Sequence, residues 1–167
     1  METTRHFTAS VYIVNDGATA LHDHHRIPGL IPPGGHVDRD ELPHEAGLRE
    51  VREETGLEPT LVDSTPDVPA PAGRALPRPR HQLLYDINVT GDGRVGHQHI
   101  DHIYFATVPS RDIDPAPGED GPEVWEWFTP AELREGAPDP DVAELGIEAI
   151  RAAGADANSD ADVDSDV

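Results

Sequence analysis

A loop and a helix that follow each other directly constrain the fold of this chain most strongly. Residues 22–41, HDHHRIPGLIPPGGHVDRDE, are dense in proline and glycine, which is typical of a loop with an unusual backbone path. Residues 43–55, PHEAGLREVREET, have a helical composition, with Pro43 in the first turn and Gly56 placed as a C-terminal cap. Three apolar residues of this segment can face a core: Leu48, Val51 and Leu57.

The predicted helix places three carboxylates on one face. Glu50, Glu53 and Glu54 are spaced i, i+3 and i+4. Like charges at this spacing destabilise an isolated helix by about 0.2–0.5 kcal/mol per pair, so a compensating cation is expected. Oxygen ligands of this kind bind hard divalent ions such as Mg²⁺. For the helix alone, a solvated acidic face is the alternative interpretation.

The spacing of residues 35–57 favours a metal site over a solvated acidic face. Gly35 is followed after five residues by Glu41, and after seven more by REVREETGL, residues 49–57. This pattern resembles the Nudix box, G-x5-E-x7-R-E-U-x-E-E-x-G-U, in which U is aliphatic. The resemblance extends to PPGGHVD, HIDHIYFATV and EWFTPAEL, and it covers most of residues 7–135.

The resemblance implies an α/β fold in which a mixed β-sheet lies between helices, an α/β/α arrangement that carries a catalytic loop-helix-loop. The implied reaction is Mg²⁺-dependent hydrolysis of a pyrophosphate bond in a nucleoside diphosphate linked to another moiety, with metal-activated water. The alternative is a catalytically inactive Nudix-fold module that binds nucleotides or regulates. Such modules commonly lose box carboxylates, whereas this chain retains them.

The resemblance also implies roles for individual residues. Mg²⁺, with Mn²⁺ as an alternative, would be bound by the carboxylates of Glu50, Glu53 and Glu54 and by the carbonyl oxygen of Gly34. Glu53 and Glu50 are accordingly catalytic candidates. Two further catalytic candidates, Arg49 and Glu41, would orient the loop against the helix, and their alternative interpretation is ordinary surface charge.

The general base is left open by the resemblance, because Nudix members differ in this group. Some use a glutamate of the box, and others use a carboxylate from a loop near the later strands. The segment PGEDGPEVWEW contains three candidates for an additional base or ligand: Glu119, Asp120 and Glu123. The nature of the group joined to the nucleoside diphosphate is not indicated by the sequence.

A second metal-like pattern lies in GHQHIDHIYF, residues 96–105. His97, His99, Asp101 and His102 match the His-x-His-x-Asp-His pattern of metallo-β-lactamase-like hydrolases. That fold needs further histidine ligands downstream, and no histidine follows His102. If the strand begins early enough, alternation places His97, His99 and Asp101 on one face. They would then line a substrate pocket, with a structural hydrogen-bond network as the alternative.

The charge of the chain is strongly one-sided. Asp and Glu number 33 against 12 Lys and Arg, all of them arginine, and the formal net charge is −21. This field repels nucleic acid and anionic lipid, and in ordinary buffer it destabilises the compact state by self-repulsion. The composition resembles that of proteins from salt-in halophiles, where molar salt shortens the Debye length to about 3 Å. An acidic mesophilic protein is the alternative.

The rest of the sequence predicts strands near residues 7–14, 18–22, 82–89, 102–108 and 123–128. Residues 63–80 are rich in proline and predict an irregular surface excursion. In the segment after the last strand, Thr129 can cap a helix opened by Pro130. Residues 1–152 are expected to form one Nudix domain, followed by an acidic disordered tail over 153–167.

Cysteine, long apolar runs and an apolar leader segment are all missing from the sequence, and the expected partners and location follow from this. No cysteine is present, which excludes disulfides and thiolate metal sites. No run approaches the roughly 18 apolar residues of a spanning helix, and the N-terminus lacks an apolar leader segment. We expect a cytoplasmic protein that binds a small nucleotide-type substrate, without nucleic acid or membrane, and for which a homodimer is left open.

Overall fold

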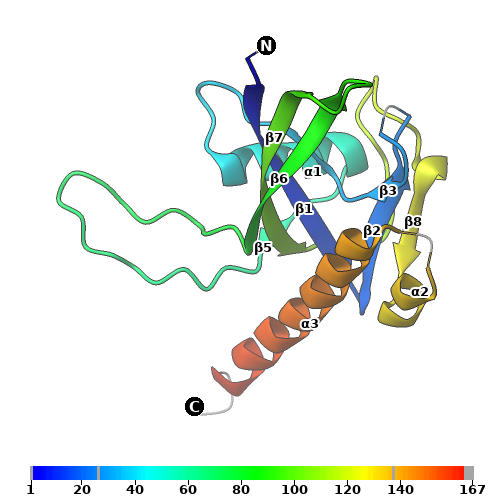
Figure 1. The fold of residues 1–167 in the computed structure, drawn as a ribbon. Coiled ribbons are helices and arrows are strands. Elements are labelled where there is room, and N and C mark those ends of the chain that lie inside the picture. Colours follow the sequence, from blue (N-terminus) through cyan, green and yellow to red (C-terminus); the bar gives the residue numbers. More distant parts are fainter. Residues whose placement is uncertain (1, 26, 137, 164–167) are drawn as a thin grey trace.

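The computed structural model describes residues 2–25, 27–136 and 138–163 (Figure 1). The elements in chain order are β1 (Thr4–Asn15), β2 (Ala18–Asp23), β3 (Leu30–Ile31), β4 (Gly34–His36), α1 (Pro43–Thr55), β5 (Thr60–Leu61), β6 (His81–Val89), β7 (Val95–Thr107), a 3-10 turn (Pro122–Val124), β8 (Trp125–Phe128), α2 (Pro130–Glu135) and α3 (Pro140–Val163).

The strands form one mixed sheet with the order β3-β2-β1-β7-β5, to which β4, β6 and β8 are added by pairing with β1, β7 and β2. The central pair, β1 and β7, is parallel, and the other pairs are antiparallel. The hairpin between β1 and β2 turns through Asp16 and Gly17, whose φ angles are 45° and 75°. Positive φ at both central residues is typical of the tight turn that the sequence NDG predicts.

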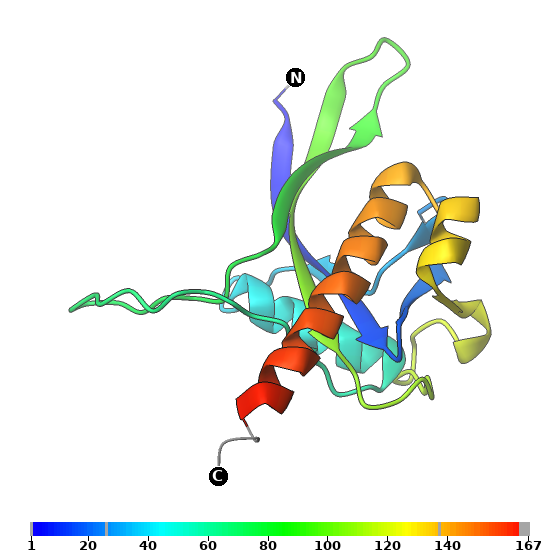
Figure 2. The same cartoon turned by 90° about the horizontal axis from the view of Figure 1, so that it is seen from below.

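Helices cover both faces of this sheet, as Figures 1 and 2 show. One core cluster packs α1 against the sheet and includes Val11, Ile13 and Val51. The other packs α2 and α3 against the opposite face and includes Tyr12, Phe105 and Leu133. Alternate residues of β1 enter the two clusters because successive strand side chains point to opposite faces. The predicted α/β/α arrangement is therefore confirmed.

Most predicted elements are present, several of them with different bounds. Helix α1 begins and ends where the sequence predicts, and Gly56 caps it with φ of 70°. A Cβ at position 56 would lie 2.2 Å from the carbonyl oxygen of Asp114, so glycine is required there. Helix α2 follows the Thr129 cap. Residues 63–80 form no helix or strand and extend away from the domain (Figure 1).

Two regions differ from the sequence prediction. The strand expected at 102–108 begins at Val95, because β6 and β1 pair with its first half. Helix α3 continues to Val163, so residues 153–163 of the expected disordered tail are helical, and 164–167 lie outside the described residues. At the start of this stretch, Ala153 packs into the core together with Ala149 one turn earlier. The division of the chain at residue 152 stays a prediction.

Candidate metal and active site

Helix α1 lies close to strand β4 because position 35 is glycine. A Cβ atom there would lie 2.2 Å from Oε1 of Glu50, so a larger residue would displace this carboxylate. The backbone N–H of the preceding residue, Gly34, donates to Oε2 of Glu54 at 3.0 Å. Strand β4 therefore contacts two of the three predicted metal ligands and fixes their position relative to the sheet.

Arg49 connects the helix to the loop. Its Nε and Nη2 donate to the two carboxylate oxygens of Glu41 at 2.8 and 3.1 Å, and Nη2 also donates to the carbonyl of His36 at 3.2 Å. Its Nη1 donates to Glu50 at 2.8 Å and to Glu53 at 2.9 Å. The planar guanidinium suits such paired carboxylate contacts. This geometry supports an orienting role for Arg49 and Glu41, and it keeps two predicted ligands side by side.

Glu54 is a buried carboxyl group among other acids. Its residue is 9% exposed. Burial raises its pKa to about 8 against the opposing Gly34 hydrogen bond, and the charges of Glu50 and Glu119 act in the same direction as burial. Burial also raises the pKa of Glu50. A cation among these groups would favour their ionised forms, and a ligand set made only of oxygens fits a hard divalent ion.

Glu54→Gln is expected to change how the stability of the metal-free protein depends on pH. The native pKa of about 8 lies above the ordinary value of 4.5, so between these values the native state binds a proton that the unfolded chain has lost. The wild-type protein therefore loses stability as pH rises through this window. In EDTA, the unfolding free energy of the variant minus that of the wild type should rise by up to about 1.4 kcal/mol per pH unit. Urea denaturation measures it, and a difference independent of pH would contradict the raised pKa.

A small pocket opens beside Glu54. It is lined by His22, His24, His25, Glu54, Gly118, Glu119, Asp120 and Trp125. The Nδ1 atom of His25 lies 2.8 Å from Oδ2 of Asp120, and this hydrogen bond lowers the pKa of Asp120. Of the three predicted loop carboxylates, Glu119 and Asp120 therefore share a pocket with Glu54, whereas Glu123 does not line it.

The histidines of this pocket are not predicted by the sequence analysis, although HDHH at 22–25 is a signal that could have identified them. His22 is buried and stacks on Trp125, with ring centroids 4.2 Å apart and an interplanar angle of 6°. Burial, and then the charge of His24, lowers the pKa of His22 to about 4. His22 is therefore a neutral ring at neutral pH.

The structure places His97, His99 and Asp101 within β7, on one face of the sheet by strand alternation. Asp101 is buried and accepts hydrogen bonds from Oγ1 of Thr8 at 2.9 Å and from Oγ of Ser10 at 2.8 Å. Both of its oxygens are thus engaged in a structural hydrogen-bond network, which is the alternative to a substrate pocket that the sequence allows. Burial, and then His36, lowers the pKa of His99 to about 4.

The metallo-β-lactamase interpretation of residues 97–102 is wrong. Asp101 is held by hydroxyl groups, and His102 belongs to the opposite face of β7, where Nδ1 lies 3.1 Å from the carbonyl of Thr8. The pattern therefore cannot converge on one ion, and the mixed sheet between helices is a different fold.

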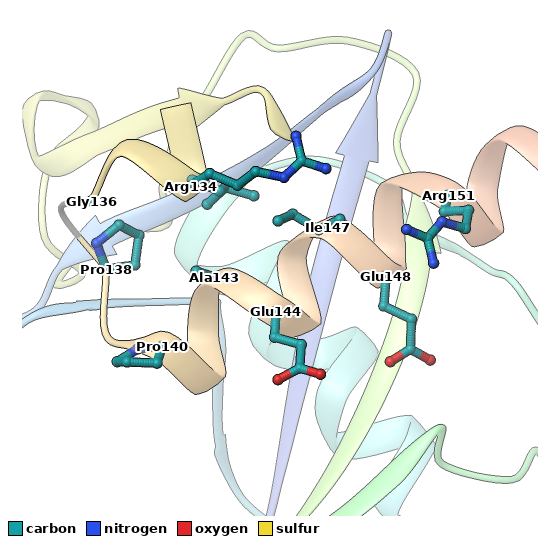
Figure 3. Close-up of a pocket in the computed structure, with 10 residues that line it drawn as sticks. Arg134, Gly136, Pro138, Pro140, Ala143, Glu144, Ile147, Glu148 and Arg151 are labelled. Carbon is teal, nitrogen blue, oxygen red and sulfur yellow. The ribbon is translucent and has the colours of Figure 1, made fainter. Parts of the chain in front are cut away.

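A larger cavity, of 790 Å³, lies between α2 and α3 (Figure 3). Its walls include Arg134, Ile147, Glu148 and Arg151, and none of the predicted site residues lines it. The carboxylate site is thus separate from this cavity.

Comparison with known proteins agrees with this geometry. The Nudix domain family matches residues 4–146. A crystal structure of a Nudix-family hydrolase from Clostridium perfringens is similar at 31% identity, covering 89% of this chain and 97% of that one, with a TM-score of 0.74. None of the curated proteins compared with the chain is similar enough to count as a match.

More distant structures share the fold. A MutT protein from Methanosarcina mazei is 17% identical, with coverage of 90% and 96% and a TM-score of 0.59. The dihydroneopterin triphosphate pyrophosphohydrolase of Escherichia coli is 16% identical, with coverage of 86% and 91% and a TM-score of 0.56.

Proposed function

Because the chain belongs to the Nudix family of hydrolases, which act on nucleoside diphosphate derivatives, we propose that it is a Mg²⁺-dependent pyrophosphohydrolase. Its substrate would be a nucleoside diphosphate linked to another moiety. The observation that carries the proposal is the carboxylate site at β4 and α1, where Glu54 is buried among acids and Arg49 aligns Glu50 with Glu53. A buried acidic cluster of this kind is costly without a cation.

The proposed metal ligands are Glu50, Glu53 and Glu54 with the carbonyl oxygen of Gly34. When bound there, Mg²⁺ would neutralise pyrophosphate charge and lower the pKa of a water molecule, and Mn²⁺ has the same ligand preference. The protein holds the carboxylate ligands in position for the metal. Arg49 holds two of the carboxylates, and the N–H of Gly34 fixes the third.

The group that accepts the proton from water is proposed to be Glu119 or Asp120, or else Glu53 of the box. The two loop carboxylates share a pocket with Glu54. Asp120 is paired with His25 at 2.8 Å, and its lowered pKa keeps it ionised. Glu123 lies outside this pocket and is the weakest of the three loop candidates.

The substrate-facing wall is proposed to include the β7 face that carries His97, His99 and Asp101. In this arrangement Asp101 holds the hydroxyl groups of Thr8 and Ser10 in place by accepting hydrogen bonds from both. The imidazoles contact the substrate. The net charge of −21 repels polyphosphates, so the substrate would arrive with bound cations. The same charge argues against nucleic acid as a partner.

No helix among the described residues is long and apolar enough to cross a membrane. A cytoplasmic location is proposed, and the homodimer stays a prediction.

The proposal is tested with a substrate panel. Purified protein in molar KCl with MgCl₂ is incubated with nucleoside triphosphates, oxidised nucleotides, ADP-ribose, NADH and dinucleoside polyphosphates. We expect phosphate-containing products from at least one class, detected by chromatography, and loss of turnover in EDTA. Complete inertness across the panel, with nucleotide binding retained, would instead favour the binding module.

A further inference from the structure

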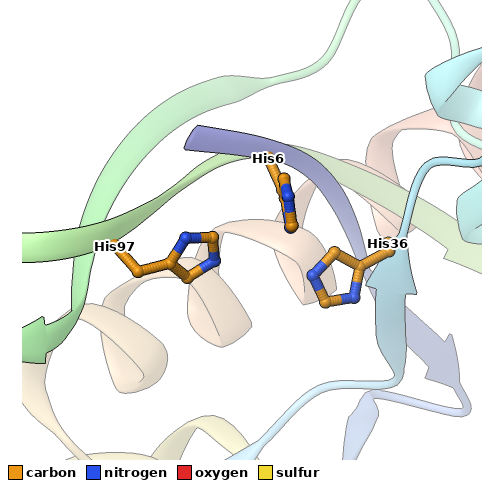
Figure 4. A group of neighbouring side chains, drawn as sticks. All are labelled: His6, His36 and His97. Atoms are coloured by element: carbon orange, nitrogen blue, oxygen red, sulfur yellow. The ribbon is translucent and has the colours of Figure 1, made fainter. Parts of the chain in front are cut away.

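Three histidines from three different strands meet at one end of the sheet. His6 lies on β1, His36 on β4 and His97 on β7, and one ring nitrogen of each lies within 4.8 Å of those of the other two. The ring of His6 lies 5.3 Å from that of His36 and 4.7 Å from that of His97, measured between centroids. Figure 4 shows the three rings turned toward one another.

The strand register explains this meeting. In the parallel β1–β7 pair, residue 4 lies opposite His97 and His6 lies opposite His99, while β4 places His36 opposite Thr8. Residues 4, 6 and 8 of β1 point to one face, and directly paired residues share that face. The three rings therefore belong to one surface, and none of them is a carboxylate of the Nudix box.

The hydroxyl group of Thr4 orients the ring of His97. Oγ1 of Thr4 lies 2.8 Å from Nδ1 of His97 and 3.3 Å from the carbonyl oxygen of Gly96, to which it can donate. Because this contact engages Nδ1, the tautomer with its hydrogen on Nδ1 has the lone pair of Nε2 free to bind a metal. Partners of this kind orient histidine ligands in metal sites.

The chemistry of the cluster differs from that of the carboxylate site. Neutral imidazole suits zinc and other divalent transition metals, whereas carboxylates suit Mg²⁺. Three histidines leave a fourth position open in a tetrahedral zinc site, with Zn–N distances of about 2.0–2.1 Å. His6 and His36 are exposed, so their rings can rotate to shorten the present separation. The net charge of −21 also raises the local concentration of cations.

We propose that His6, His36 and His97 bind a divalent transition-metal ion of the zinc class, at a site separate from the carboxylates of α1. The ion cross-links β4 to the β1–β7 pair. Because β4 is the strand that contacts Glu50 and Glu54, the ion also fixes the base of the catalytic loop. The alternative is that the three rings only pack edge to edge. With the ion bound, the ring of His97 is a metal ligand, and of the two β7 imidazoles proposed for the substrate wall only that of His99 is left to contact the substrate. The zinc proposal does not depend on the proposed hydrolase activity, because metal binding is measured without substrate.

The test is calorimetric titration of the protein with ZnCl₂ in excess MgCl₂, which occupies the carboxylates. We expect a saturable zinc site, and we expect His6→Gln, His36→Gln and His97→Gln each to weaken it by at least about tenfold. Thr4→Val should also weaken it by about tenfold, because the hydrogen bond that orients the ring of His97 is lost. Thermal unfolding adds a second readout, since zinc should raise the Tm of the wild type and not that of the histidine variants.

Two matched variants control for other histidines. His81→Gln removes a half-buried histidine on β6, paired with Glu148 at 2.7 Å. His25→Gln removes a member of the His24, His25 and Asp120 group beside Glu54. Both should retain the zinc affinity of the wild type. Loss of binding only in His25→Gln, equal affinity in all variants, or no saturable zinc binding would each overturn the proposal. Circular dichroism confirms that each variant is folded.

Discussion

Replacement of Glu53 by Gln is expected to lower kcat for Mg²⁺-dependent hydrolysis by about three orders of magnitude. A bound metal supplies several kcal/mol of transition-state stabilisation, and each 1.36 kcal/mol is worth a factor of ten, so a neutral amide in place of a ligand has a large effect. The side chain of Glu53 is 44% exposed and contacts Nη1 of Arg49. A substitution at such a position costs little stability, so the variant should be folded.

The control for this variant is Glu45→Gln on the same helix. Glu45 accepts a hydrogen bond from the N–H of Leu42 at 3.0 Å in the first turn of α1, and glutamine can make the same contact. Steady-state kinetics should therefore show wild-type turnover for Glu45→Gln and almost none for Glu53→Gln, while circular dichroism and Tm remain similar. Turnover retained by Glu53→Gln would show that the metal ligands are elsewhere.

The carboxylate half of the site is predictable from sequence because its contacts are local. Arg49, Glu50 and Glu53 lie on one helix, so a helical period is enough to place them together. The Arg49–Glu41 pair spans only eight residues, at 2.8 Å between Nε and Oε1. The cap at Gly56 is also local, because helices commonly end in a glycine with a left-handed backbone.

The other half of the site depends on strand register, which the sequence does not specify. His25 and Asp120 are separated by 95 residues and meet because β2 pairs with β8, with His22 opposite Trp125. Likewise, the proximity of His6 and His97 can be inferred only once the parallel pairing of β1 and β7 is known. A shift of one residue in either pair would move these side chains to the opposite face.

The later part of helix α3 is not predicted from the sequence, for a different reason. Its later residues are acidic and small, a composition typical of disorder because it offers little apolar area for burial. Alanine nevertheless has the strongest helix propensity. Small side chains at Ala149 and Ala153 also let α3 approach the sheet, where both are buried. Composition therefore underestimates the C-terminal part of a helix in which alanine follows Val142 and Leu145 in the core contact.

Salt is expected to stabilise this protein strongly. With a net charge of −21, the compact state is opposed by self-repulsion, and molar salt screens it by shortening the Debye length from about 10 Å at 0.1 M to about 3 Å at 1 M. We expect Tm to rise by on the order of 10 °C between 0.1 M and 2 M KCl, which corresponds to about 3 kcal/mol for a domain of this size. Calorimetry in both buffers measures the shift. The same result is what the halophile interpretation of the composition requires.

Charge variants test whether repulsion is the cause. Asp67, Glu135 and Glu144 are exposed, and replacing them by Asn, Gln and Gln removes three negative charges. This triple variant should gain stability at low salt and show a smaller rise in Tm with KCl than the wild type. Exchanging Asp for Glu and Glu for Asp at the same positions keeps the charge and should leave the rise unchanged. If the neutralised and charge-conserving variants respond alike, KCl acts by strengthening apolar burial instead of by screening, and the acidic surface does not limit stability at low salt.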